Sequence, residues 1–147
     1  MNLIFSILIF LVDKILIDKV ILVVENKAYT LFDLKKHCIL TSVVEEKQDW
    51  TPCDSEERLK SIFSDFLFRA ILLENIGRNS KKVETGDLKE IFQKVKEAGL
   101  SEKDVEDWIK DTIKIKEYIE KSFRGKKEIL KEHIETLKKN MKIRIYF

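Results

Sequence analysis

The stretch Asp54–Gly77, DSEERLKSIFSDFLFRAILLENIG, predicts one long central helix on which the rest of the chain packs. At about 100° per residue, its apolar side chains form a single stripe, as a helix against a core requires. The stripe consists of Leu59, Ile62, Phe63, Phe66, Ala70 and Leu73, and Leu67 and Ile71 widen it. Asp54 and Glu57 have the spacing of a capping box, and Gly77 fits the position just past a helix. Both ends of the helix are therefore marked.

A second apolar surface follows the C-terminal half of this helix. Phe68 and Leu72 are four residues apart and project from nearly the opposite side to the main stripe. An apolar surface of this kind needs a cover or a partner. The sequence leaves three open: the flanking helices, a second copy of the chain, or a bound client.

Length and composition indicate one mainly helical domain. A chain of 147 residues is long enough for one domain with a real core. One Pro and four Gly in the whole chain argue for long helices with short connections. The 28 Lys and Arg side chains nearly balance the 26 Asp and Glu, and a net charge of +2 gives no reason to expect a nucleic-acid partner.

The chain begins with an unbroken apolar run, LIFSILIFLV, at residues 3–12. This run is about half as long as a membrane-spanning helix, but it matches the apolar part of a signal peptide. We therefore expect residues 1–14 to be an export signal and residues 15–147 to form the domain. No Lys or Arg precedes the run and no A-x-A-like cleavage site follows it, so the alternative is an uncleaved helix that contacts the membrane through residues 3–12.

The segment before the central helix predicts a hairpin and a first helix. Val20–Val24 is apolar and β-branched, and Glu25–Ala28 supplies a tight turn with Asn26 at a position of positive φ. Thr30 and Asp33 then have the spacing of a helix start. The inner face of that helix consists of Leu31, Leu34, Cys38, Ile39 and Val43.

Three more helices follow the central one. Asp87–Ala98 is amphipathic and stops at Gly99. Ser101 with Asp104 caps a longer helix that runs to residue 123. A last, strongly charged helix spans Lys126–Asn140, with Ile129, Leu130, Ile134 and Leu137 inward.

The chain closes on MKIRIYF at residues 141–147, where apolar and polar residues alternate as in a strand. A terminal strand needs a partner, and the other strand candidates lie near residues 20–30. The predicted fold is therefore mainly α, with a small β-sheet formed by the N-terminal hairpin and a C-terminal strand.

Side chains with catalytic or metal chemistry are sparse. His37 and His133 are solitary, and we expect both at helix surfaces or boundaries. The sequence has no Gly-rich phosphate loop, Cys-x-x-Cys pair or nucleophile elbow, so we expect neither an enzyme nor a metal or cofactor site. Cys38 and Cys53 leave two alternatives: a disulfide in an exported protein, or a buried small Cys38 and an unrelated thiol. We favour the second.

The residues Ile17–Leu34, IDKVILVVENKAYTLFDL, resemble the opening of the mature periplasmic chaperone SurA family, a hairpin followed by a helix. Later pieces come in the family's order: LFRAILLENIGR at 67–78, IKIKEYIEKSF at 113–123 and LKKNMKIRIYF at 137–147. In this family the terminal strand returns to the N-terminal hairpin. The resemblance implies a chaperone core that binds unfolded or partly folded outer-membrane proteins through an apolar groove.

The chain departs from that family at one point. Members commonly carry parvulin-type prolyl isomerase domains after the helix that here ends near Phe123. This chain has only Arg124-Gly125-Lys126 in that interval, so we expect no prolyl isomerase activity.

The function expected from these observations is that of an exported, periplasmic holdase whose partners are unfolded client proteins or peptides. The candidate client-binding side chains are Phe68, Leu72, Trp50, Tyr118 and Phe123. The alternative is a structural or interaction protein, either tethered to the membrane by residues 3–12 or a homodimer whose apolar faces are buried by self-association.

Overall fold

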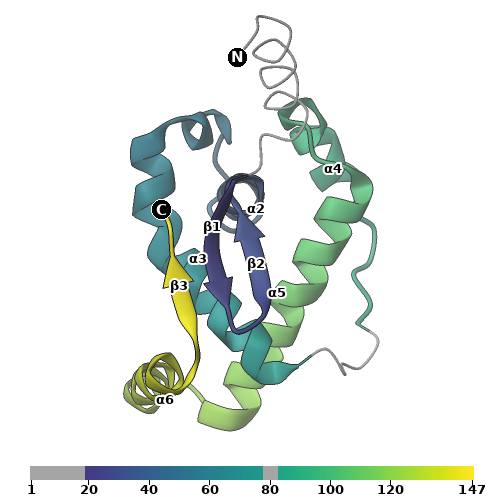
Figure 1. Ribbon diagram of the computed structural model, residues 1–147. Coiled ribbons are helices and arrows are strands. Elements are labelled where there is room, and N and C mark those ends of the chain that lie inside the picture. The colour runs from purple at the N-terminus through teal and green to yellow at the C-terminus, as the bar shows by residue number, and fades with distance from the viewer. Residues whose placement is uncertain (1–18, 78–82) are drawn as a thin grey trace, which may run out of the picture.

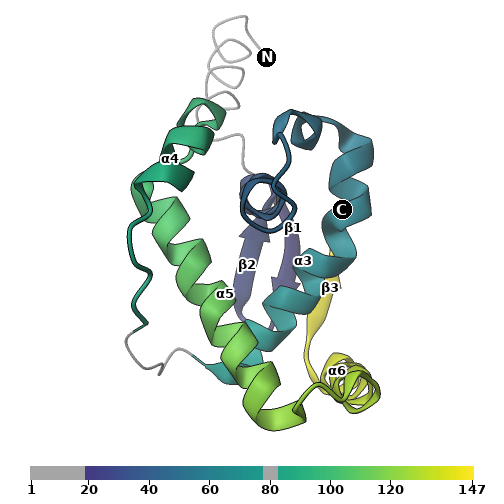
Figure 2. The same ribbon diagram turned by 180° about the vertical axis from the view of Figure 1, so that it is seen from behind.

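The computed structural model describes residues 19–77 and 83–147, and the predicted export signal at residues 1–14 lies outside them. In this part the fold is mainly α with a small antiparallel sheet, as the sequence predicts (Figure 1). Helices α3 and α5 flank the sheet in both views, and α6 lies at the lower end of the molecule (Figure 2). Within the described ranges, none of the helices combines the length and apolar content that a membrane crossing needs.

The sheet joins the two ends of the described chain, which confirms the predicted pairing. Strands β1 (Val20–Val24), β2 (Lys27–Thr30) and β3 (Ile143–Ile145) lie in the order β2-β1-β3, and both pairs are antiparallel. The predicted turn is tight, but Glu25, and not Asn26, has the positive φ, 55°. Glu25 donates its N–H to the Lys142 carbonyl at 2.7 Å, a bond to the chain leading into β3 that accompanies this conformation.

Helix α2 (Leu31–Leu40) begins at the predicted capping box of Thr30 and Asp33. It continues into a π-helical turn at Thr41–Glu45, and a 3₁₀ turn at Thr51–Asp54 follows. A disulfide joins Cys38 to Cys53, so the alternative that we favoured, two unrelated cysteines, is wrong. The sequence could not decide this, because the pairing depends on how the chain folds back after α2.

The central helix α3 (Glu56–Ile76) starts one residue later than its predicted cap. Asp54 ends the 3₁₀ turn, so Ser55 is the N-cap residue, and its hydroxyl accepts the N–H of Arg58 at 3.1 Å. The predicted capping box of Asp54 and Glu57 is therefore wrong. Gly77, with φ 79°, ends the helix as predicted.

The main core lies between α3, α2, the sheet and the first half of α5 (Glu102–Phe123). Four residues of the predicted α3 stripe are buried in it: Leu59, Ile62, Phe66 and Ala70. Phe63 and Leu73 are half-buried. Helix α4 (Lys89–Val95) and a 3₁₀ turn at Lys96–Ala98 end at Gly99, with φ 92°, which confirms the predicted stop.

A second, smaller cluster covers the other face of α3. Its fully or mostly buried members are Leu72, Ile115 and Ile134, from α3, α5 and α6 (Lys127–Asn140). The sequence allowed three possible covers for Leu72, and in the structure the flanking helices α5 and α6 cover it. Ile129, predicted to face inward, is 48% exposed, because α6 turns Leu130, Ile134 and Leu137 toward the cluster instead.

Candidate functional site

The five predicted client-binding side chains do not lie on one surface. Leu72 is fully buried and Phe123 is 8% exposed. The Tyr118 hydroxyl contacts Asn75 Nδ2 at 2.8 Å and His133 Nε2 at 3.1 Å, and its ring packs edge-on against Phe123. These three side chains are thus used in the packing of α3, α5 and α6.

Phe68 is half-buried and lines a surface groove of about 290 Å³ between α3 and α6, which we call the Phe68 groove. Its other lining residues are Ser64, Lys127, Leu130, Lys131, Ile134, Glu135 and Lys138. Lys138 pairs with Glu135 at 3.6 Å, whereas Lys127 and Lys131 have no ion pair within the described chain. The groove therefore has an apolar floor and a mostly cationic rim.

Trp50 lies elsewhere, in a depression of about 340 Å³ beside the loop before α3. Its indole N–H donates to the Lys94 carbonyl at 3.1 Å, and the ring is half-buried against the main core. This contact fixes the loop to α4. Trp50 and Phe68 thus line two different surface hollows.

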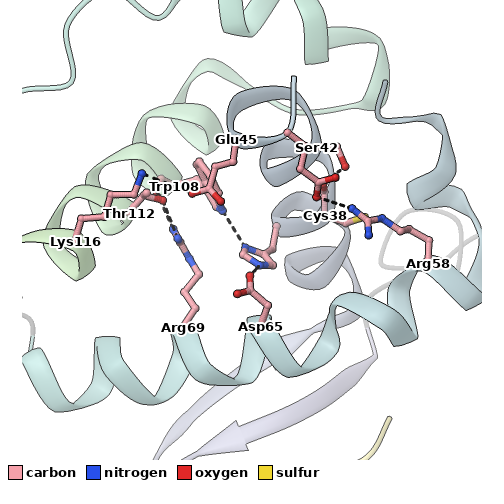
Figure 3. A network of polar contacts seen from close by, with 11 residues as sticks. Cys38, Ser42, Glu45, Arg58, Asp65, Arg69, Trp108, Thr112 and Lys116 are labelled. Carbon is pink, nitrogen blue, oxygen red and sulfur yellow. Dashed lines mark hydrogen bonds and ion pairs between the residues drawn. The ribbon is translucent and has the colours of Figure 1, made fainter. Parts of the chain in front are cut away.

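A polar network that the sequence analysis missed lies between α2, α3 and α5 (Figure 3). His37 is 4% exposed, so its predicted surface position is wrong. Trp108 Nε1 lies 3.2 Å from His37 Nδ1, and Asp65 Oδ2 lies 2.7 Å from His37 Nε2. Because an indole N–H only donates, Nδ1 must accept, which assigns the proton to Nε2 and makes it the donor to Asp65.

This geometry matters for the chemistry of the pair. A His beside an Asp is the arrangement in which a carboxylate orients an imidazole for proton transfer. Here Trp108 occupies the second nitrogen of His37, so the ring has no nitrogen left to take a proton from a substrate. The network therefore fits a positioning role. The hydrogen bond from His37 lowers the pKa of Asp65.

Arg69 extends the same network toward α5. Its guanidinium stacks on the Trp108 ring at 4.7 Å and donates to Thr112 Oγ1 at 2.7 Å and to the Trp108 carbonyl at 2.8 Å. Burial lowers the pKa of Arg69 to about 10, against an opposing effect of Asp111, so the side chain is still charged at neutral pH.

Arg69 and His37 line a partly open cavity of about 160 Å³, which we call the Arg69 cavity. Its other lining residues are Lys27, Tyr29, Asp33, Lys36, Phe66, Ala70, Leu73, Asp104, Asp107, Trp108 and Asp111. Lys36 lies 3.4 Å from Asp33 and 3.5 Å from Asp104, so these charges are paired. Burial raises the pKa of Asp111.

The sequence held two signals for this site. His37 is three residues from Leu34 and next to Cys38, on the inner face of the first helix. Arg69 is a single cation within the apolar run FLFRAILL. A charged or titratable residue among core positions needs a hydrogen-bonding or charged partner in the fold. The sequence around His37 and Arg69 does not show which residues these partners are.

No three His, Cys, Asp or Glu side chains come together as metal ligands would in the part of the chain that the structure describes. Comparison with family models, with curated proteins and with solved structures gave no match to this chain.

Proposed function

We propose that this chain is an exported, periplasmic holdase-type chaperone that binds unfolded or partly folded outer-membrane proteins and has no prolyl isomerase activity. The observation that supports this most is the Phe68 groove, in which Phe68, Leu130 and Ile134 form an apolar floor. A folded partner buries its apolar side chains, whereas an unfolded partner exposes them. These exposed apolar side chains can bind to the floor of the groove.

The size of the groove suits reversible holding. Burial of one client side chain contributes about 1.5–3 kcal/mol, and association itself costs several kcal/mol. A groove of about 290 Å³ has room for few such side chains. Binding is therefore weak for each segment and strong only for a client with several exposed segments, as a holdase needs for release.

The resemblance to the SurA family adds to the proposal. It covers Ile17–Leu34 and the order of the later helices, and it predicts the return of the terminal strand to the hairpin. The same resemblance is the ground for proposing export and for proposing that isomerase activity is absent, since residues 124–126 leave no room for the isomerase domain at the place where the family carries it.

The test is suppression of aggregation. A stoichiometric amount of the full chain is added to an outer-membrane β-barrel protein diluted from urea, and light scattering is followed. The variant is Phe68→Ser, because Leu72 is fully buried and its replacement would damage the fold. Ile129→Ser is the matched control, an exposed apolar residue of α6 outside the groove.

We expect the parent and Ile129→Ser to suppress aggregation and Phe68→Ser to lose most of this effect. A folded parent that leaves the scattering unchanged would contradict the proposal. Equal loss in both variants would contradict the assignment to the groove.

A second candidate function, self-association, is favoured by the edge of the sheet. Strand β3 lies at one edge, and the residues from its end onward include three exposed large apolar side chains: Ile145, Tyr146 and Phe147, at 50%, 56% and 37%. An edge of this kind can pair with the same edge of a second copy. Sedimentation of the parent and of Ile145→Lys distinguishes the two: a dimer that the variant loses supports this candidate, and a parent that is a monomer excludes it.

A further inference from the structure

The Arg69 cavity holds a half-buried cation, Arg69, that forms no ion pair with a carboxylate of the described residues. Asp111, Asp65 and Glu45 act on Arg69 at longer range, but none of them lies within 4.0 Å of it in residues 19–77 and 83–147. A guanidinium carries five N–H donors. The hydrogen bonds to Thr112 and to the Trp108 carbonyl use two of them, so three remain for an acceptor that residues 19–77 and 83–147 do not supply.

Arg69 is also held in place before any ligand arrives. Thr112 and the Trp108 carbonyl fix its two nitrogens, and the Trp108 ring supports its face. Trp108 is in turn fixed by His37, which is fixed by Asp65. A guanidinium ordered in this way loses little conformational entropy when it binds a carboxylate, and its planar fork fits two carboxylate oxygens.

The carboxylate of the cavity that is left to pair with a ligand cation is that of Asp111. Asp33 and Asp104 are paired with Lys36, and Asp107 lies 3.9 Å from Lys103. Asp111 has no ion pair in the described chain, and burial raises its pKa, as is usual for a carboxylate that lacks a close cation. The remaining cation, Lys27, lies over the Tyr29 ring at 5.4 Å.

The rest of the lining is apolar and the space is small. Phe66, Ala70, Leu73 and Trp108 supply carbon surface. The cavity of about 160 Å³ is close in size to engineered cavities of about 150 Å³ that take up benzene. A ligand of about six non-hydrogen atoms fills such a volume, and because the cavity is partly open a slightly larger ligand can extend toward solvent.

We propose that the Arg69 cavity binds a small zwitterionic α-amino acid with an apolar side chain, its carboxylate on Arg69, its ammonium on Asp111 and its side chain against Phe66 and Trp108. A phosphate dianion fits less well, because four aspartates line the cavity. A neutral apolar ligand would cover the three remaining N–H groups of Arg69 without giving them acceptors. This site is separate from the Phe68 groove and does not depend on the holdase proposal.

The experiment titrates the full chain with L-leucine by calorimetry and follows the indole N–H resonance of Trp108 by NMR. Two analogues dissect the ligand on the unaltered protein: 3-methylbutylamine lacks the carboxylate and 4-methylpentanoic acid lacks the ammonium. We expect saturable binding of leucine, a shift of the Trp108 resonance, and at least about tenfold weaker binding of each analogue, as for a lost charged contact.

The variants are Arg69→Gln and Asp111→Asn, with Arg58→Gln as the control, since Arg58 pairs with Glu46 on the surface. The first two weaken leucine binding at least about tenfold and the control leaves it unchanged. Absence of saturable leucine binding up to about 10 mM, or equal binding of leucine and both analogues, overturns the proposal. The analogues keep it testable even where Arg69→Gln does not fold.

Discussion

At the scale of residues, the disulfide is the contact with the clearest energetic consequence. Cys38 and Cys53 are 15 residues apart and tie α2 to the turn before α3. Closing a loop of this length stabilises a fold by about 3 kcal/mol, chiefly by restricting the unfolded chain. We expect reduction, or the change of both residues to Ala, to lower the free energy of unfolding by that amount in urea titrations. Identical unfolding midpoints with and without reductant would contradict the bond.

Asp65 gives a prediction about pH. Its pKa is lowered by the His37 hydrogen bond, so its contribution to stability is present above the unfolded pKa of about 3.9 and is lost as pH falls through the folded value. We expect Asp65→Asn to be less stable than the parent at pH 7, and the difference to shrink as pH falls below the unfolded pKa of about 3.9. The carboxylate is 61% exposed, so the difference is at most about 1 kcal/mol. A difference that does not change with pH in urea titrations would contradict this account.

Residues whose role depends on distant partners could not be predicted from the sequence. His37 lies on the inner face of α2, but its burial depends on Trp108, 71 positions away, and on Asp65. Arg69 likewise depends on Trp108 and Thr112. The apolar neighbours of His37 and Arg69 were visible in the sequence. The distant donors and acceptors that satisfy their polar atoms in the fold were not.

At the scale of elements, the helix ends depend on caps that can be tested singly. The Ser101 hydroxyl accepts the N–H of Asp104 at 3.1 Å, and the Asp104 carboxylate accepts the N–H of Ser101 at 2.9 Å. We expect Ser101→Ala to lower the free energy of unfolding by about 1 kcal/mol. Ser122→Ala, an exposed position near the other end of α5, is the control and should have almost no effect in the same urea titrations. Equal effects would mean that the cap contributes nothing specific.

Caps and stops were the most predictable features because they are local. Thr30, Ser101 and Gly99 act through neighbours three or four residues away, so their patterns are complete in the sequence. The start of α3 was misplaced by one residue because the turn Thr51–Asp54, next to the disulfide, extends up to Ser55. Even a local signal shifts when the preceding chain is fixed by tertiary contacts.

At the scale of the whole molecule, Leu72 holds α3, α5 and α6 together. Leu72 is fully buried in the second cluster, whereas Ile129 of α6 is 48% exposed. We expect Leu72→Ala to lower the free energy of unfolding by about 2–5 kcal/mol and Ile129→Ala to change it by less than about 0.5 kcal/mol. Circular dichroism during thermal unfolding measures both. A small effect of Leu72→Ala would show that α6 does not pack as described.

The sequence predicted the mainly helical fold and the meeting of the chain ends, but not how the apolar faces would be shared. Alternation in residues 141–147 had one matching partner near residues 20–30, so the sheet could be inferred. The sequence allowed three covers for Phe68 and Leu72: the flanking helices, a second copy of the chain, or a client. All three would supply apolar side chains, so the sequence could not distinguish them. The position of α6, which decides between them, depends on the whole packing and left Phe68 at the edge of a groove.

The most direct test of the holdase proposal is an NMR titration of the ¹⁵N-labelled full chain with a peptide copied from a strand of an outer-membrane β-barrel protein. We predict saturable amide shifts that cluster around the Phe68 groove, at Ser64, Phe68, Leu130 and Ile134. The Phe68→Ser variant should lose these shifts, and the Ile129→Ser variant should retain them. Absence of saturable shifts, or shifts confined to Ile145–Phe147, would contradict the proposal. The second result would favour self-association through the β3 edge.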